Sequence, residues 1–298
     1  MGRQNAIMSL DLRPVTDSAA GPAAEPQWEV GACTDVGRVR GNNEDSFCTA
    51  PGLNLYVLSD GMGGMACGEV ASRLTVETVL GYCRDAEANP SQELAGKRIE
   101  GISEASNRLV SGIRLANEIV HRAALEGANH QKMGATVVAV FLADGCMSVA
   151  HVGDSRAYRL RGDHLEQLTQ DHTYIAGLSL DPGNEAQFGC NSLHHLLTRA
   201  VGVEPEVEVD VLDELVMEGD IVLLCSDGLT REVTDREIGW VLRDSRHAQE
   251  AADQLVTLAN DAGGGDNITA IVLRHAPKES GASGNLTRFG RWLSGRGN

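Results

Sequence analysis

Three apolar runs in this 298-residue chain end at an aspartate, and this repetition constrains the fold more than any other feature. The runs break at Asp60, Asp154 and Asp227, and the first of them reads LNLYVLSDGMGG. A fourth carboxylate, Asp266, lies just before an apolar run instead of after one. Short continuous apolar runs are typical of buried strands. The pattern therefore predicts that central strands bring four carboxylates to one place.

An aspartate followed by glycine is also a common hairpin turn. Asp144-Gly145 and Gly162-Asp163 fit that simpler interpretation, because each joins two alternating segments. Carboxylates at the ends of neighbouring strands are a different case, since two anions about 5 Å apart repel by about 3 kcal/mol at an effective dielectric constant of about 20. Four such groups need a cation. Oxygen ligands favour Mg²⁺ or Mn²⁺, and the lack of an ordered cysteine or histidine set argues against zinc.

Composition limits the function classes. The formal net charge of −17 argues against a nucleic-acid-binding protein, which presents a basic face. Seven scattered cysteines without a Cys-x-x-Cys pair indicate reduced thiols in a cytoplasmic protein. No run approaches the roughly 18 apolar residues of a membrane helix. We expect a cytoplasmic protein with no transmembrane segment and no nucleic-acid partner.

The order of the expected elements indicates a mixed α and β fold with mostly antiparallel connections. Length alone allows two domains or one large layered fold. We expect helices from about residue 69 to 83 and over 102–123, 235–242 and 248–260, and strands within 28–49 and 53–60 and over 135–142, 146–152, 157–161, 164–168, 207–211, 221–225 and 267–273. The four strands within 135–168 are expected to form one meander.

Three further segments carry less pattern. Residues 1–27 contain three prolines and no periodicity, and we expect a flexible leader. Residues 171–195 contain Gly177, Pro182 and Gly183 and indicate a mobile surface loop. Residues 277–298 form a basic, polar tail.

Six short motifs occur in the order found in the PP2C-type (PPM) metal-dependent protein phosphatases, which this chain resembles over residues 28–276. The motifs are RGNNED (40–45), DGMGG (60–64), GAT (134–136), GDSR (153–156), SDG (226–228) and GDN (265–267). The resemblance implies an αββα sandwich: two antiparallel sheets face to face, with a helix pair on each outer side. It also implies hydrolysis of phosphoserine and phosphothreonine in proteins, in opposition to a serine/threonine kinase, by a monomer.

The resemblance assigns roles to individual residues. Asp60 would bridge two Mn²⁺ or Mg²⁺ ions, the Gly61 carbonyl would join one ion, and Asp227 and Asp266 would hold the other. Glu44 and Asp45 match an acidic pair near the metals, and Asp154 matches a residue that helps to hold a third ion in bacterial members. Arg40, which by itself indicates only a solvated surface charge, matches the arginine that grips the substrate phosphate. The paired cations would supply a hydroxide nucleophile by lowering the pKa of a bridging water.

Met62 departs from the eukaryotic branch, which has a histidine there as candidate general acid, and so resembles the bacterial branch. The group that protonates the leaving oxygen stays open between His172 and a metal-bound water. Residues 171–197 match the family's flap beside the site. Ser155 is expected to be a turn or capping group, and residues 134–136 a strand entry.

Two rival interpretations remain. Gly153-Asp154-Ser155 together with Asp244 and His247 resembles the serine esterases that carry a GDS block, but both motifs lie outside their usual structural context. The other interpretation is a catalytically weak protein of the same fold that binds phosphoproteins. Such a protein should have lost metal ligands.

Overall fold

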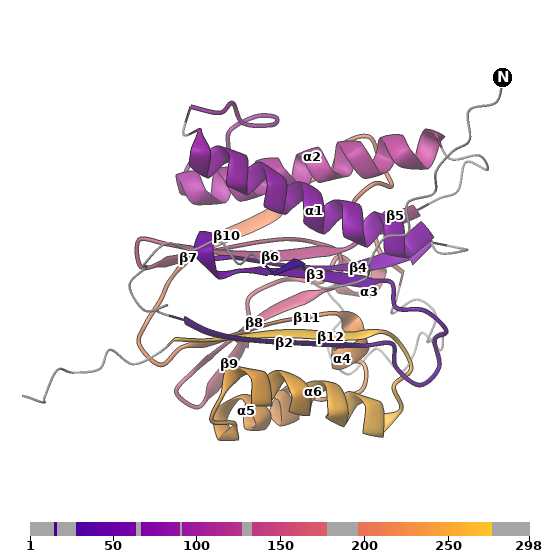
Figure 1. Cartoon of the computed structure of the whole chain (residues 1–298), viewed down its shortest axis with the longest axis vertical. Coiled ribbons are helices and arrows are strands. Elements are labelled where there is room, and N and C mark those ends of the chain that lie inside the picture. The colour runs from indigo at the N-terminus through magenta and orange to yellow at the C-terminus, as the bar shows by residue number, and fades with distance from the viewer. Residues whose placement is uncertain are drawn as a thin grey trace, which may run out of the picture.

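Two antiparallel β-sheets lie face to face, and helices cover both outer surfaces in the computed structural model (Figure 1). The structure describes residues 15–16, 28–63, 67–89, 91–126, 133–177 and 196–275. The predicted four-layer αββα sandwich is confirmed. None of the helices in these segments is long and apolar enough to cross a membrane.

The first sheet has the strand order β1-β3-β4-β6-β7-β10, with β5 paired to β4, and the second has the order β2-β12-β11-β8-β9. The strands of the first sheet are β1 (Val15–Thr16), β3 (Asp45–Ala50), β4 (Leu55–Gly63), β5 (Met133–Ala135), β6 (Val137–Ala143), β7 (Cys146–Val152) and β10 (Asp210–Leu215). Those of the second are β2 (Trp28–Asp35), β8 (Arg156–Arg161), β9 (His164–Gln167), β11 (Ile221–Cys225) and β12 (Ile268–His275).

Helices α1 (Cys67–Ala88) and α2 (Glu104–Glu126) cover the first sheet, and α5 (Asp235–Asp244) and α6 (Ala248–Ala262) cover the second (Figure 1). Short helical turns complete the fold: η1 (Pro51–Leu53), α3 (Tyr174–Gly177) and α4 (Asp227–Thr230). The apolar positions of α1 and α2 recur at helical spacing and face the sheet beneath them. A capping box between Thr234 and Glu237 starts α5.

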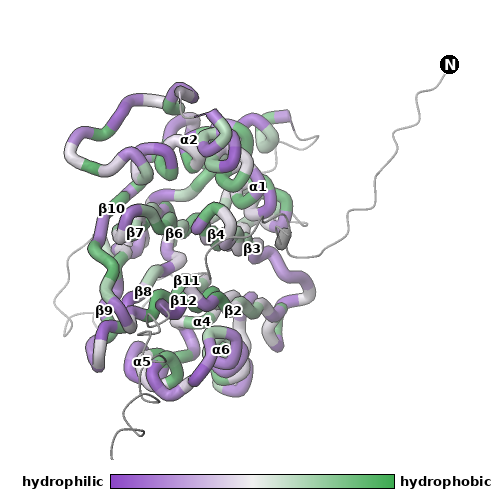
Figure 2. Tube along the Cα trace, turned by 60° about the vertical axis from the view of Figure 1, so that its left-hand side comes forward, coloured by the Kyte–Doolittle hydropathy of each residue, from purple (hydrophilic) through white to green (hydrophobic). Residues whose placement is uncertain are grey.

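Three apolar clusters stabilise the layers. One lies between the first sheet and its helices, one between the second sheet and its helices, and one between the two sheets. The inter-sheet cluster includes Tyr56, Leu58, Val140, Val222 and Leu273, all nearly inaccessible to solvent. Figure 2 shows the hydrophobic residues along the sheets and the inner faces of the helices. This packing fixes the distance between the strand ends that carry the aspartates in the two sheets.

The expected meander over residues 135–168 is wrong. β6 and β7 belong to the first sheet, whereas β8 and β9 belong to the second. The chain changes sheet at Gly153, whose φ of 105° favours glycine and whose added Cβ would lie 2.7 Å from Thr136. This crossing places Asp154 between the sheets.

Two other element predictions need correction. β4 does not stop at Asp60 but continues to Gly63, because Gly61 and Met62 pair with β5. The strand expected at 207–211 begins only at Asp210. The preceding loop is held instead by the Asn117 side chain, whose amide donates to the carbonyls of Glu204 and Pro205.

The predicted boundaries of the leader, the 28–276 domain and the tail stay predictions. Residues 277–298 lie outside the described residues, as does the leader apart from β1, which pairs in parallel with β3. The loop expected at 171–195 is described only at 171–177.

We predict that Gly31→Ala weakens the second sheet's contact with α6. An added Cβ on Gly31 would lie 2.2 Å from the backbone nitrogen of Gln249, so the helix would have to move. We expect a loss of about 1–3 kcal/mol in the free energy of unfolding, measured by urea denaturation. Gly81→Ala is the matched control, because nothing lies within 4 Å of its added Cβ and alanine favours a helix. Equal stability of the two variants would contradict the prediction.

Candidate active site

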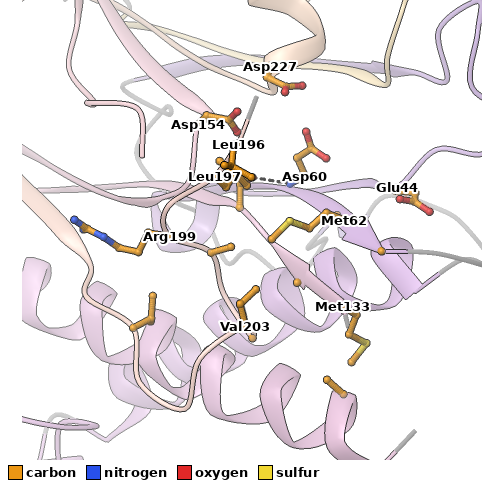
Figure 3. Close-up of a pocket in the computed structure, with 18 of the residues that line it drawn as sticks. Glu44, Asp60, Met62, Met133, Asp154, Leu196, Leu197, Arg199, Val203 and Asp227 are labelled. Atoms are coloured by element: carbon orange, nitrogen blue, oxygen red, sulfur yellow. Dashed lines mark hydrogen bonds between the residues drawn. The ribbon is translucent and has the colours of Figure 1, made fainter. Parts of the chain in front are cut away.

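The predicted carboxylates come together at the same end of the strands of both sheets. Asp60 on β4 lies directly opposite Asp45 on β3. Asp227 begins α4 just after β11, and Asp266 lies two residues before β12. Asp154 lies at the crossing between β7 and β8. A cavity of about 1430 Å³ opens here, and its lining includes Arg40, Glu44, Asp60, Gly61, Asp154, Asp227 and Asp266. Figure 3 labels four of these: Glu44, Asp60, Asp154 and Asp227.

Asp45 is the one predicted site residue that lies behind the cavity instead of lining it. Its Oδ2 accepts hydrogen bonds from Ser226 Oγ at 2.8 Å and from Thr269 Oγ1 at 2.6 Å. Both donors belong to the second sheet's side of the site, whereas Asp45 belongs to the first. Asp45 therefore links the two sheets beneath the other carboxylates.

Thr136 holds the backbone at Asp60. The Asp60 amide donates to Thr136 Oγ1 at 3.0 Å, and the Thr136 amide donates to the Asp60 carbonyl at 2.8 Å. Thr136 Oγ1 also bonds Ser155 Oγ at 2.6 Å, which connects Asp60 to the Asp154 crossing. Residues 134–136 do enter a strand, as predicted, but the sequence analysis assigned Thr136 no part in the site. Asp60, the residue that Thr136 holds, is 76 residues away along the chain, so no local sequence pattern could indicate this role.

Close backbone packing explains the glycine at position 61. A Cβ there would lie 2.1 Å from the carbonyl oxygen of Gly68 at the start of α1. The Gly61 amide donates to the Glu44 carbonyl at 3.1 Å, and Ser72 Oγ donates to the same carbonyl at 2.6 Å. Glu44, Gly61 and the first turn of α1 thus form one compact corner of the cavity.

Asn267 is a second residue that the sequence analysis left without a role. Its Oδ1 accepts from the Glu44 amide at 2.8 Å, and its Nδ2 donates to the carbonyls of Val36 and Asn42. It ties the loop that carries Arg40 and Glu44 to the segment that carries Asp266. The GDN motif already indicated this role, because a buried asparagine next to a predicted metal ligand commonly hydrogen-bonds the segments that carry the ligands.

Burial and mutual repulsion dominate the electrostatics of the site. Burial, followed by the charges of Asp45, Asp227, Asp154 and Asp266, raises the pKa of Asp60 well above its usual value. Burial is also the first cause that raises the pKa of Asp45 to about 7 and that of Asp154 to about 7. The pKa of Asp227 is raised for the same reason. These shifts show how unfavourable this group of anions is without cations.

Two unpaired atoms indicate where cations fit. Asp45 Oδ1 and Asp227 Oδ1 are buried, and neither has a hydrogen-bond partner within the described part of the chain. Buried oxygens of this kind either bind a ligand or carry a large desolvation cost. The potential metal ligands around them are carboxylate and carbonyl oxygens, which suit Mg²⁺ and Mn²⁺. The residues present therefore fit the predicted ions.

Two arginines neutralise part of this charge. Arg40 Nη2 lies 2.9 Å from Asp266 Oδ2, and the Arg40 side chain stays 55% exposed. Arg231 pairs with both Asp227 and Asp266, the latter at 2.7 Å. Arg231 escaped the sequence analysis, although it follows Asp227 by four residues, the spacing that puts two side chains on one face of a helix.

His172 does not reach the cavity. It is buried, its ring stacks on His151 at 4.7 Å, and its Nδ1 accepts a hydrogen bond from the Gly153 amide at 3.0 Å. The proton must therefore lie on Nε2, which faces Asp210 Oδ2 at 3.3 Å. This tautomer leaves His172 no free nitrogen for a metal, so the neighbouring His151, His172 and Asp210 form a polar contact and not a metal site. His172 is also not among the described residues that line the cavity.

The esterase interpretation fails on geometry. Ser155 is 1% exposed, and its hydroxyl bonds the distant Thr136 side chain instead of acting as the predicted turn or capping group. His247 is 73% exposed and pairs with Glu29 at 3.1 Å, beside α6. A nucleophile needs a base within hydrogen-bond reach, and these two residues serve different parts of the molecule.

Oxygen ligands for divalent cations, an adjacent arginine and an open cavity define a metal-dependent hydrolase of phosphate esters. The family profile described as protein phosphatase 2C matches residues 38–263. The serine/threonine phosphatase stp of Listeria innocua is 35% identical over 255 residues, covering 83% of this chain and 96% of that protein. The serine/threonine protein phosphatase PstP of Mycobacterium tuberculosis is 36% identical over 243 residues, covering 81% of this chain and 44% of that protein.

Solved structures agree. The crystal structure of Mycobacterium tuberculosis PstP superposes with a TM-score of 0.71 at 32% identity, covering 84% of this chain and 99% of that chain. A second structure, of the PstP catalytic domain in complex with two manganese ions, gives a TM-score of 0.68 at 33% identity, covering 84% of this chain and 99% of that chain. The chain therefore belongs to the protein phosphatase 2C family, and the predicted class, a metal-dependent serine/threonine protein phosphatase, is confirmed.

We predict that Arg231→Gln tightens Mn²⁺ binding. The guanidinium pairs with two carboxylates that would otherwise face the ion, and a positive charge nearby repels it. We expect the Mn²⁺ dissociation constant to fall by roughly tenfold, or about 1.4 kcal/mol, measured by isothermal titration calorimetry. Arg243→Gln is the control, because Arg243 pairs only with surface carboxylates in the described part. An unchanged constant in Arg231→Gln would contradict the prediction.

The raised pKa values predict opposite effects of pH with and without metal. Without metal, the folded protein keeps the protons of Asp45 and Asp154 up to about pH 7, whereas an unfolded aspartate loses its proton near 3.8. The folded state thus binds more protons in this window, and these groups make stability fall as pH rises through it. Metal must displace those protons, so its affinity rises with pH. We expect MnCl₂ to raise Tm more at about pH 7.5 than at about pH 5.5, and an equal rise at both would contradict the assignment.

Proposed function

We propose that this phosphatase removes phosphoryl groups from phosphoserine and phosphothreonine in proteins through Asp60, Gly61, Asp227 and Asp266 as metal ligands, and so opposes a serine/threonine kinase. The observation that carries the proposal is the set of buried carboxylates with raised pKa values and unpaired oxygens at the base of an open cavity. The manganese pair in a relative's structure supports two ions per site.

The ligands divide between the sheets. Asp60, on whose pKa the charges of Asp45 and Asp227 act, would bind both ions, and the Gly61 carbonyl would join one of them. Asp227 and Asp266 would hold the other, and Asp154 a third. Glu44 and Asp45 would orient and balance these groups from the first sheet's side. When bound, the ions neutralise the phosphate and supply an activated water.

Arg40 is the proposed phosphate-binding residue. Its guanidinium already contacts one oxygen of Asp266 and is more than half exposed to the cavity side. A guanidinium offers two parallel donors that match phosphate oxygens. Metal binding would compete for Asp266 and free Arg40 to hold the phosphoryl group in line for attack.

No side chain is assigned as the general acid. Met62 has no proton to give, and His172 lies outside the cavity. The only histidine among the described lining residues is His121, whose Nδ1 bonds the Gly202 carbonyl at 3.1 Å. We propose that water supplies the proton to the leaving serine or threonine oxygen.

The remaining proposals concern the cellular setting. We propose a cytoplasmic location and a monomer. The monomer is supported by the helices that cover the outer faces of both sheets, which leave no open face of the described sheets to a second copy. Retention of Asp60, Asp227 and Asp266 at the cavity argues against a catalytically weak, phosphoprotein-binding regulator.

We predict that Asp60→Asn lowers kcat/KM for a phosphothreonine peptide in Mn²⁺ by more than about 100-fold, beyond what loss of a supporting residue costs. The fold should survive, because the change removes one charge from a crowded anionic cluster. Asp144→Asn is the matched control: Asp144 lies in the β6–β7 turn at a φ of 52°, which asparagine tolerates. Undiminished turnover in Asp60→Asn would refute the metal assignment.

Opposition to a kinase is tested separately. A phosphoproteome of cells carrying Asp60→Asn should contain more phosphoserine and phosphothreonine on particular proteins than that of cells carrying Asp144→Asn. Identical phosphoproteomes would contradict the proposed role while leaving the enzymatic assignment to the kinetic measurement.

A further inference from the structure

The cavity extends well beyond the carboxylates. On the far side of Met62 from Asp60, Figure 3 shows Val203 and Met133 over the helices. We call this region the apolar arm, and its lining residues are Met62, Leu125, Met133, Val203 and Val207. Leu125 is 59% exposed and Val203 51% exposed, unusually high for large apolar side chains within a cavity.

The apolar arm is built directly onto the metal-binding strand. Met62 follows Asp60 by two residues on β4 and pairs with Gly134 on β5. Ala135 in turn exchanges two backbone hydrogen bonds with Val201, at 3.0 and 2.8 Å. A Cβ on Gly134 would lie 2.8 Å from Met62 Cε and 2.9 Å from Val203 Cγ2, so these two side chains meet above the glycine. A chain bound at the metals would therefore continue over an apolar floor.

An acidic rim borders the apolar arm. Glu204, Glu206 and Glu208 line the same cavity from the loop between Val201 and β10, and all three are exposed. The loop is held from below by the buried Asn117 side chain, which accepts from the Gly202 amide at 2.7 Å and donates to the Glu204 carbonyl at 3.0 Å. The backbone is thus fixed while the carboxylates remain free to contact a ligand.

Among the described residues, the rim is only weakly neutralised. The arginines of the cavity lining are already engaged: Arg40 and Arg231 with the metal-site aspartates, and Arg199 with Asp210. Arg199 approaches Glu208 only at 3.8 Å, and neither Glu204 nor Glu206 forms an ion pair with a described residue. The net charge of −17 adds to this negative potential.

We propose that the apolar arm binds the residues that flank the phosphorylated residue, and that it selects phosphoprotein segments carrying a bulky apolar side chain and a lysine or arginine. The inference rests on the proposed function, since it needs a phosphoprotein at the metals. The apolar floor matches the bulky apolar side chain, and the acidic rim matches the positive charge of the lysine or arginine. Because the apolar arm continues directly from the strand that carries Asp60, we infer that its occupant is the substrate chain.

The test uses the full chain loaded with Mn²⁺ and matched phosphothreonine peptides. One peptide carries leucine and arginine beside the phosphothreonine, a second carries leucine and glutamate, and a third carries glycine and arginine. We expect kcat/KM for the first to exceed each of the others by about tenfold, an advantage that shrinks at high salt for the charge pair. p-Nitrophenyl phosphate, which has no flanking residues, reports on the metal centre alone.

Two variants locate the preference. The double change Glu204→Lys with Glu206→Lys should lower the arginine-to-glutamate ratio by about five- to tenfold, and Val203→Asn should lower the leucine-to-glycine ratio by about threefold. Both sites are exposed, so the fold should tolerate the changes. Glu218→Lys is the matched control, because Glu218 is exposed and lies outside the cavity lining.

The outcomes separate the two proposals. Turnover of all three peptides at equal efficiency overturns the apolar arm and leaves the proposed function standing. Turnover of p-nitrophenyl phosphate without that of any phosphothreonine peptide overturns the proposed function itself. If the charge reversal raises turnover of every peptide alike, the apolar arm holds another occupant, such as the basic segment 277–298, and the inference is wrong.

Discussion

Repulsion among buried carboxylates is the constraint on which the rest of this structure depends. Asp45, Asp60, Asp154 and Asp227 lie close enough that burial and mutual charge raise the pKa of each. Such a cluster opposes folding unless protons, arginines or metal ions compensate it. The remainder of the fold must therefore supply both the stability to hold it and the geometry to make it useful.

The sandwich meets this requirement by dividing the ligands between two sheets. Asp45 and Asp60 come from the first sheet, Asp227 and Asp266 from segments flanking strands of the second. The apolar layer between the sheets fixes their separation. Three polar side chains form hydrogen bonds between the two sheets' segments at the site: Thr136, Ser226 and Asn267. Because these supports are hydrogen-bonded to several segments at once, the ligands are oriented before any ion arrives.

Arginines give the same site a second way to offset its charge. Arg231 and Arg40 pair with aspartates that also suit a metal, so guanidinium and cation compete for the same oxygens. For Arg40 this competition would link metal binding to release of the guanidinium that we propose to bind the substrate phosphate. Glu204 and Glu206 of the acidic rim have no such partner among the described residues, which distinguishes a surface suited to recognising substrate from one committed to the protein's own stability.

Local patterns in the sequence, helical periodicity and apolar runs that end in Asp-Gly, determined the helix pairs and the convergence of the carboxylates. The layered αββα fold followed from the order of six motifs that resembles a known family. It did not determine the crossing at Gly153, the extension of β4 to Gly63 or the late start of β10, which depend on pairing with segments far along the chain. The parts played by Thr136, Asn117, Asn267 and Arg231 were likewise decided by tertiary structure. Each acts through partners whose identity is set by which surfaces the packed sheets bring together, because hydrogen bonds reach about 3 Å and charges in salt solution about 10 Å.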